Sequence, residues 1–263
     1  MTEQSKTISP EHEYLGAGKS AAYGLQHVLT MYGGIIAPPL IVGTAAGLEA
    51  YQIGLLIAAA LFVGGLATIL QTVGVKYIGA KLPLVQGVSF AGVATMVAIV
   101  TTGGGLQAVY GAVIVASLIG FFLAPYFSKI IRFFPPVVTG CVITIIGLSL
   151  LPVAVRWMMG GNPKAPEWGS VENIGLALMT LAFVICLNLS RHAAIRRLSI
   201  LLAIVFGSVV AYLFGFGDFS KVANGTWIQV PSFFAFGLPT FELTAIISML
   251  IVTLVIMTET TAD

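Results

Sequence analysis

The chain of 263 residues carries a formal net charge of +2, and hydrophobic residues make up 58% of it while charged residues make up 8%. A soluble domain has about half apolar and about a quarter charged residues, so this composition excludes an ordinary soluble fold. Long apolar stretches between short charged clusters instead predict an all-α polytopic membrane protein in a lipid bilayer. The small net charge gives no reason to expect nucleic acid as a partner. Two cysteines inside apolar stretches do not suggest a disulfide framework.

A polar and charged tail, residues 1–19, comes first, and it lacks the apolar core of a cleavable signal peptide. Seven apolar segments of about the length that crosses a bilayer follow it, and an eighth begins later in the chain. The expected crossings are residues 21–42, 51–75, 82–100, 106–127, 137–155, 174–189 and 198–216, with the eighth starting in the apolar run 243–257.

The third segment, residues 82–100, differs from the others because a proline and two glycines interrupt it. We expect it to be partly extended, and broken backbone at membrane depth is tolerated only where protein or a cavity satisfies its polar groups. Such breaks often face a substrate or an ion. Gln86 and Ser89 add side-chain donors and acceptors, and Phe90 offers a ring for a planar ligand. The alternative is a glycine-rich helix packed closely on a neighbour.

Lysine and arginine are distributed unevenly between alternate connections, which indicates how the chain is oriented. If the N-terminus is cytoplasmic and residues 82–100 cross once, nine of these residues lie inside and three outside. The inside residues are Lys6, Lys19, Lys76, Lys81, Lys129, Arg132, Arg191, Arg196 and Arg197, and the outside residues are Arg156, Lys164 and Lys221. This asymmetry follows the positive-inside rule, so we expect a cytoplasmic N-terminus and an eighth segment that returns inward.

The apolar run 243–257 leads directly into Glu259 and Asp263, and carboxylates within a membrane segment usually mark a functional site. The two acids are four residues apart, so they would share one face of a helix. In a low dielectric both cannot ionise easily, so one could exchange a proton near neutral pH. The run has fifteen residues where about twenty are needed, so we expect the helix to continue. The alternative is a helix that ends with the run and leaves both acids solvated.

His27 follows Gln26 in the first segment. It could accept a proton or bind a ligand, or it could stay neutral and hydrogen-bond to a neighbouring helix, and both interpretations remain open. The sequence contains no metalloprotease, phosphate-loop, nucleophile-elbow or paired-cysteine motif. The intramembrane histidine, the acids and the broken segment therefore indicate transport rather than an enzyme, with no metal site and no cofactor expected.

Four stretches in the same order resemble motifs of the nucleobase–cation symporters, also called nucleobase–ascorbate transporters. GLQHVL at residues 24–29 resembles the glutamine–histidine motif of the first helix, and LVQGVSFA at residues 84–91 resembles the third segment. FPPVVTG at residues 134–140, followed by ITIIGL at residues 143–148, is similar to the entry of the fifth helix. TETTAD at residues 258–263 resembles the eighth-helix motif. The overall character is that of the bacterial xanthine and uric acid permeases.

The resemblance implies two inverted repeats of seven helices, of which this chain holds the first and the start of the second. Core-domain segments one to four would occupy residues 20–132, gate-domain segments five to seven residues 133–240, and a truncated eighth segment residues 241–263. Family members are longer, so we expect this chain to be a fragment that does not transport alone. A homodimer is expected for the complete protein.

The resemblance also implies proton-coupled uptake of a purine nucleobase, xanthine or uric acid, across the bacterial inner membrane. Sodium is the less favoured coupling ion. Glu259 would bind the nitrogens of the purine ring, and the backbone and ring of Phe90 would contact the base. His27 would order the site and take part with Glu259 and Asp263 in proton coupling. The small side chain of Ser89 would leave room for the C8 oxygen of urate.

Gln86 is a further candidate substrate contact, because its side chain carries both donors and an acceptor. Two other functions remain as alternatives. One is an anion transporter or exchanger of the same architecture, although Glu259 disfavours an anionic substrate unless it is protonated. The other is a membrane protein that does not transport.

Overall fold

The computed structural model describes residues 16–76, 78–130, 136–216 and 234–262, which are mostly helical. Within these ranges the α-helices are α1 (Ala17–Ala45), α2 (Ala50–Val73), α3 (Val93–Ile99), α4 (Gly105–Ile130), α5 (Pro136–Met158), α6 (Val171–Asn188), α7 (Ala193–Arg197), α8 (Ser199–Leu213) and α9 (Leu243–Ala262). A 3-10 turn, η2 (Phe90–Gly92), precedes α3, and a π-helical turn, η3 (Val100–Gly104), follows it. The all-α prediction is confirmed for the described part of the chain.

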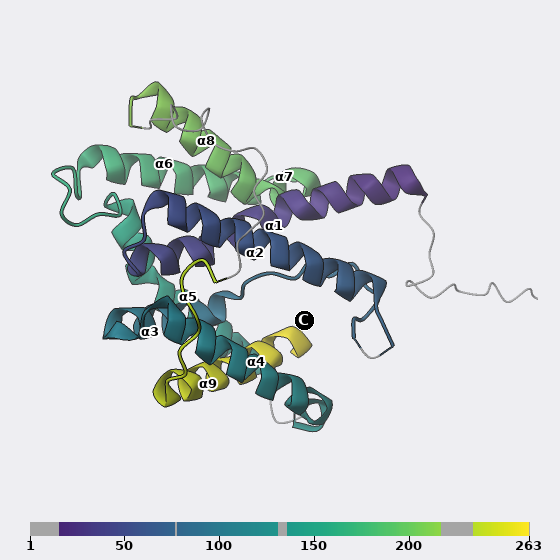
Figure 1. Ribbon diagram of the computed structural model, residues 1–263. Helices are drawn as coiled ribbons and strands as arrows, with labels where there is room; N and C mark the ends of the chain where they lie inside the picture. Colours follow the sequence, from purple (N-terminus) through teal and green to yellow (C-terminus); the bar gives the residue numbers. More distant parts are fainter. Residues whose placement is uncertain (1–15, 77, 131–135, 217–233, 263) are drawn as a thin grey trace, which may run out of the picture.

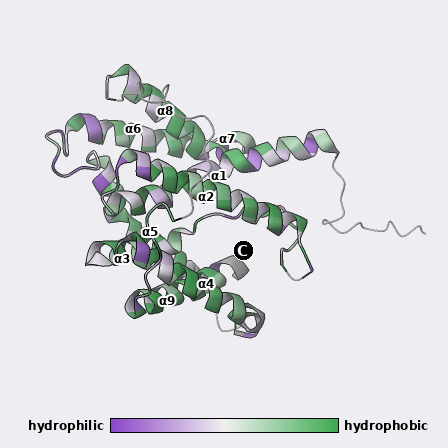
Figure 2. Ribbon diagram, in the orientation of Figure 1, coloured by the Kyte–Doolittle hydropathy of each residue, from purple (hydrophilic) through white to green (hydrophobic). Residues whose placement is uncertain are grey.

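Among the described residues, five stretches are long and apolar enough to cross a membrane, and two shorter apolar helices accompany them. The five are Ala17–Ala45, Ala50–Val73, Phe90–Phe127, Gly140–Met158 and Val171–Asn188, and the two shorter ones are Ser199–Leu213 and Leu243–Glu259. In Figure 1 α1 and α2 run in opposite directions across the view, and Figure 2 shows hydrophobic residues along most of the length of the long helices. These features support a multi-pass membrane protein, while eight crossings remain a prediction.

The third predicted segment is broken, as its sequence indicated. Residues 83–89 have no helical structure, and the helix begins only at η2. A turn lies between the predicted segments 82–100 and 106–127, where Gly103 has a φ of 102° and Gly105 a φ of 65°. Such left-handed conformations cannot continue a right-handed helix. The chain therefore reverses between α3 and α4, and Ile99 packs back into one cluster with Ala108.

Helix α9 packs along α4, and small residues let the two backbones come close. Their shared buried cluster consists of Ile99, Ala108, Val109, Ala112, Ala116, Ala245 and Met249. A Cβ atom added at Gly111 would collide with the carbonyl oxygen of Thr240, and one added at Gly120 would lie 2.8 Å from Cγ2 of Thr253. The later residue of α4, Gly120, meets the later residue, Thr253, so α4 and α9 run parallel.

The segment that enters α9 is held on the first turns of α4 by Gln107. Its side-chain Nε2 donates to the carbonyl oxygen of Phe236 at 2.9 Å. Its own backbone carbonyl accepts a hydrogen bond from the N–H of Thr240 at 3.0 Å. These two bonds place the start of α9 beside the start of α4, although 129 residues separate Gln107 from Phe236.

One helix was not predicted from the sequence, and the end of the last segment was. The connection between the predicted segments 174–189 and 198–216 contains the short helix α7. The eighth segment continues past its apolar run, as the sequence predicted, because α9 extends to Ala262. The alternative in which the helix ends before Glu259 is therefore wrong, and Glu259 is a helical residue. Asp263 lies outside the described residues.

Candidate functional site

The broken third segment runs between two groups of helices, and glycines make each contact close. On one side, a Cβ atom added at Gly64 of α2 would lie 2.9 Å from the carbonyl oxygen of Gln86, and one added at Gly87 would lie 2.7 Å from Cγ1 of Ile35 in α1. On the other side, a Cβ atom added at Gly92 would lie 3.3 Å from Cε of Met249 in α9. The segment therefore contacts α1, α2 and α9 at these points.

The extended backbone is tied to α2 by one side chain. The hydroxyl of Thr68 accepts a hydrogen bond from the N–H of Gln86 at 2.9 Å and donates to the carbonyl of Gly64 at 2.7 Å. The side chain of Gln86 makes a weaker contact, because its Nε2 is 3.5 Å from the carbonyl oxygen of Leu84, beyond the usual hydrogen-bond range. The sequence interpretation identified Gln86 but missed Thr68.

Ser89 and Phe90 stand where the extended backbone becomes helical. Ser89 is the N-cap of η2, and its Oγ accepts a hydrogen bond from the N–H of Ala91 at 3.2 Å. The Oγ of Ser89 thus stabilises the turn at η2 by accepting this hydrogen bond. The side chain of Phe90 is 36% exposed, so its ring is not buried in the protein core. Both residues are placed at the break, as the sequence predicted, and their contact with a substrate stays a prediction.

Glu259 lies on α9, which also contacts the break. A Cβ atom added at Gly92 would lie 3.7 Å from Cγ1 of Val252 in α9. Glu259 follows Val252 by seven residues. Seven residues are almost two helical turns, so Glu259 shares the face of Val252 and lies about 10 Å further along the axis. The preceding residue, Thr258, is buried and donates to the carbonyl of Leu254 at 2.9 Å. Glu259 itself is half-buried.

The direction of the two elements brings Glu259 toward the predicted substrate contacts. In Figure 1 the thin segment that leads into α3 and the helix α9 run in opposite directions. Residues before Gly92 and residues after Val252 therefore lie toward the same side of their mutual contact. This arrangement places the end of α9 that carries Glu259 on the same side of the contact as residues 83–89, and a contact of Glu259 with Ser89 or Phe90 stays a prediction.

His27 is placed differently. It is exposed on α1, eight residues or about 12 Å along the axis before Ile35, the α1 residue that meets Gly87. The first turns of α1 extend away from the other helices in Figure 1. The structure thus does not bring His27 against the break, and its role in ordering the site or coupling protons stays a prediction.

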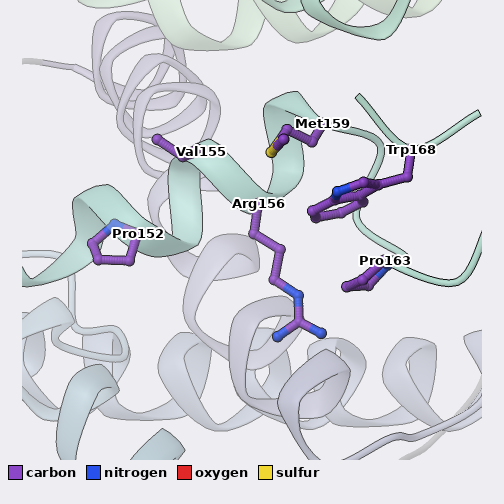
Figure 3. A pocket seen from close by; sticks show the side chains of 6 residues that line it. All are labelled: Pro152, Val155, Arg156, Met159, Pro163 and Trp168. Atoms are coloured by element: carbon purple, nitrogen blue, oxygen red, sulfur yellow. The ribbon is translucent and has the colours of Figure 1, made fainter. Parts of the chain in front are cut away.

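The described residues line two concavities, and neither is formed by the predicted site residues. A largely apolar cavity of about 740 Å³ lies between α1, α2, α4 and the segment before α9, and Val88 of the broken segment lines it. An open depression of about 390 Å³ lies at the end of α5, where Arg156 extends beside Trp168 and Pro163 (Figure 3). The predicted site residues line neither. The described residues thus form two facing elements of a site rather than a closed pocket.

The described residues contain no group of three histidine, cysteine, aspartate or glutamate side chains that could hold a metal ion. Thr68 and Gly64 are the neighbours of the break that the sequence did not reveal. A threonine four residues after a glycine in an apolar helix is a weak signal, because helical threonines commonly bond to their own backbone. Only the fold shows that this hydroxyl reaches a second segment.

A multi-pass helical protein with a broken segment facing a carboxylate-bearing helix has the features of a membrane transporter rather than an enzyme. Residues 18–263 match the model of a family described as the Permease family, and the chain belongs to this family, the nucleobase–ascorbate transporters. The resemblance that the four motifs suggested is confirmed.

Curated relatives cover most of the chain. A uric acid permease, PucK, of Bacillus subtilis is 47% identical over 238 residues, which are 90% of this chain and 55% of the relative. The xanthine permease of Bacillus subtilis is 39% identical over 94% of this chain and 56% of its own length. The uric acid transporter UacT of Escherichia coli is 35% identical over 97% of this chain and 53% of its own length. The chain thus spans about half the length of these relatives.

Proposed function

We propose that the complete protein takes up a purine nucleobase, xanthine or uric acid, by proton symport across the bacterial inner membrane. The observation that carries the proposal is the juxtaposition of a broken membrane segment with α9, which bears Glu259. The names of the relatives, uric acid and xanthine permeases, support the substrate class. We further propose that the N-terminus is cytoplasmic and that the chain supplies one seven-helix repeat and the beginning of another.

Each residue of the proposed site has a chemical role. The carboxylate of Glu259 accepts hydrogen bonds from ring N–H groups of the purine, because an ionised carboxylate is an acceptor only. The ring of Phe90 packs on the planar base, and the backbone around Phe90 hydrogen-bonds the base. Gln86 and Ser89 supply further donors and acceptors. His27 and Asp263 are assigned to proton coupling together with Glu259.

Uptake measurements test this proposal. The protein expressed from its complete gene, in cells without purine permeases of their own, is expected to accumulate radiolabelled xanthine or urate against a gradient. A protonophore should abolish the accumulation, because the proton gradient drives it, whereas removal of sodium should not. Accumulation that survives the protonophore and requires sodium would overturn proton coupling. Accumulation of sulfate with no purine uptake would replace the proposal by the anion transporter of the same architecture.

A further inference from the structure

We infer that Thr68, together with Gly64, is a positioning residue that holds the backbone of the broken segment in the conformation that binds substrate. The inference rests on the proposed function, because it assigns Thr68 an effect on purine affinity. Neither residue contacts the substrate in this scheme. Both act through the backbone of Gln86, which lies three residues before Ser89 and four before Phe90.

The first observation is that Thr68 makes two hydrogen bonds at once. Its hydroxyl donates to the carbonyl of Gly64, as helical threonines commonly do, and Thr144 of α5 makes the same type of bond to Gly140 at 2.8 Å. The oxygen of Thr68 in addition accepts the N–H of Gln86 at 2.9 Å. The second bond connects α2 to a segment 18 positions later in the sequence.

The second observation is the close approach of the two backbones. Gly64 is buried, and a Cβ atom added there would lie 2.9 Å from the carbonyl oxygen of Gln86. A methyl group at this position would push against backbone, which cannot move aside as a flexible side chain can. Gly65, the next residue of the same helix, has nothing within 4 Å of an added Cβ atom. Space is therefore restricted on the face of α2 that meets the broken segment.

These contacts matter because residues 83–89 lack the hydrogen bonds of a regular helix. A backbone N–H group in apolar surroundings needs an acceptor, and broken backbone within a membrane depends on neighbouring protein to supply it. Thr68 supplies this acceptor to Gln86. Without the hydroxyl, the N–H of Gln86 would need a different acceptor. The backbone that leads to Ser89 and Phe90 would then shift.

The test compares Thr68→Val, which removes the hydroxyl at nearly constant shape, with Thr68→Ser, which keeps it. Uptake of labelled xanthine and urate by the protein from the complete gene gives KM and Vmax, and the amount of protein in the membrane normalises Vmax. For Thr68→Val we expect KM to rise about tenfold, the effect of one lost hydrogen bond, at a Vmax per molecule within about twofold. Thr68→Ser should retain the original KM, and the control Thr144→Val should not change it.

A second pair of variants keeps the test decisive if Thr68→Val does not reach the membrane. Gly64→Ala leaves the hydroxyl in place but displaces the carbonyl of Gln86, so it should also raise KM by about tenfold. The adjacent control Gly65→Ala should have the original KM. If Thr68→Val and Gly64→Ala lower only the amount of protein and leave KM unchanged, both residues are structural and the inference is wrong.

A measurement without transport separates this inference from the proposed function. In a variant with Cys141 and Cys186 replaced, the substitution Val88→Cys reports the accessibility of the broken segment to a thiol reagent. We expect Thr68→Val, but not Thr144→Val, to change its alkylation rate by about tenfold if the segment moves. An altered rate in a protein that takes up no purine would keep the positioning role and overturn the proposed function. An unaltered rate together with purine uptake at the original KM would overturn the positioning role alone.

Discussion

Gln107 on α4 and Thr240 before α9 are joined by a backbone hydrogen bond of 3.0 Å, and the side chain of Gln107 binds the same segment again at Phe236. This pair determines where α9 begins relative to α4. Because Glu259 lies on α9, the position of the proposed substrate contact depends on an interaction between residues far apart in the sequence. The relationship also explains why α9, the last described helix, lies against α4 rather than beside α8, which precedes it.

Replacement of Gln107 by leucine tests this anchor. The side chain keeps its approximate size but loses the Nε2 donor, so the carbonyl of Phe236 loses its partner. We expect a loss of about 1 kcal/mol in stability, measured as a lower Tm of the detergent-purified protein from the complete gene. The control is Gln71→Leu, a glutamine on α2. An equal Tm for Gln107→Leu and the original protein would show that the anchor contributes nothing measurable.

The close contact at Gly111 predicts a larger effect. A Cβ atom there would collide with the carbonyl oxygen of Thr240, so Gly111→Ala must separate α4 from the segment that enters α9. We expect a loss of about 2 kcal/mol in stability, in the range of overpacked cores, again read from Tm. Gly54→Ala on α2, where nothing lies within 4 Å of an added Cβ atom, is the matched control. Equal melting temperatures for the two variants would contradict the observed packing.

Glu259→Gln tests the proposed substrate contact. The amide keeps the size of the side chain but loses the charge and replaces one acceptor oxygen by a donor, so it binds ring N–H groups poorly and cannot carry a proton. We expect the variant to reach the membrane and to lose accumulation of labelled xanthine and urate, by at least about a hundredfold. Uptake at the original rate would falsify the role of Glu259.

Ser89→Asn tests the proposed preference for urate. The larger side chain would occupy room beside Phe90, and we expect the ratio of urate to xanthine uptake to fall by about tenfold, the effect of a lost contact or a modest steric clash. Ser89→Ala is the companion variant, because it removes the N-cap oxygen that accepts from Ala91 without adding volume. If both variants change the ratio equally, the cap of η2 rather than the size of residue 89 determines selectivity.

The sequence predicted the local features of the fold well, because each depends on neighbouring residues. Apolar length predicted the long helices and the connection between segments 82–100 and 106–127, where φ values of 102° and 65° at Gly103 and Gly105 are accessible to glycine. The third segment, residues 82–100, was expected to be partly extended, and its residues 83–89 have no helical structure. Helix α7 was missed because its five residues lie in a charged connection without the apolar pattern of the longer helices.

The sequence by itself determined the membrane class, the apolar helical segments and the break, since composition and short motifs carry this information, while the structure showed that the helix of the eighth segment includes Glu259. Only the tertiary structure decided which elements face each other. Thr68 reaches Gln86, Gly92 meets Met249, and Gln107 holds the entry to α9. Such contacts depend on how helices dock, and in an apolar chain nearly every helical face is a suitable docking surface. Docking also left His27 exposed on α1, away from the break that its motif suggested it would accompany.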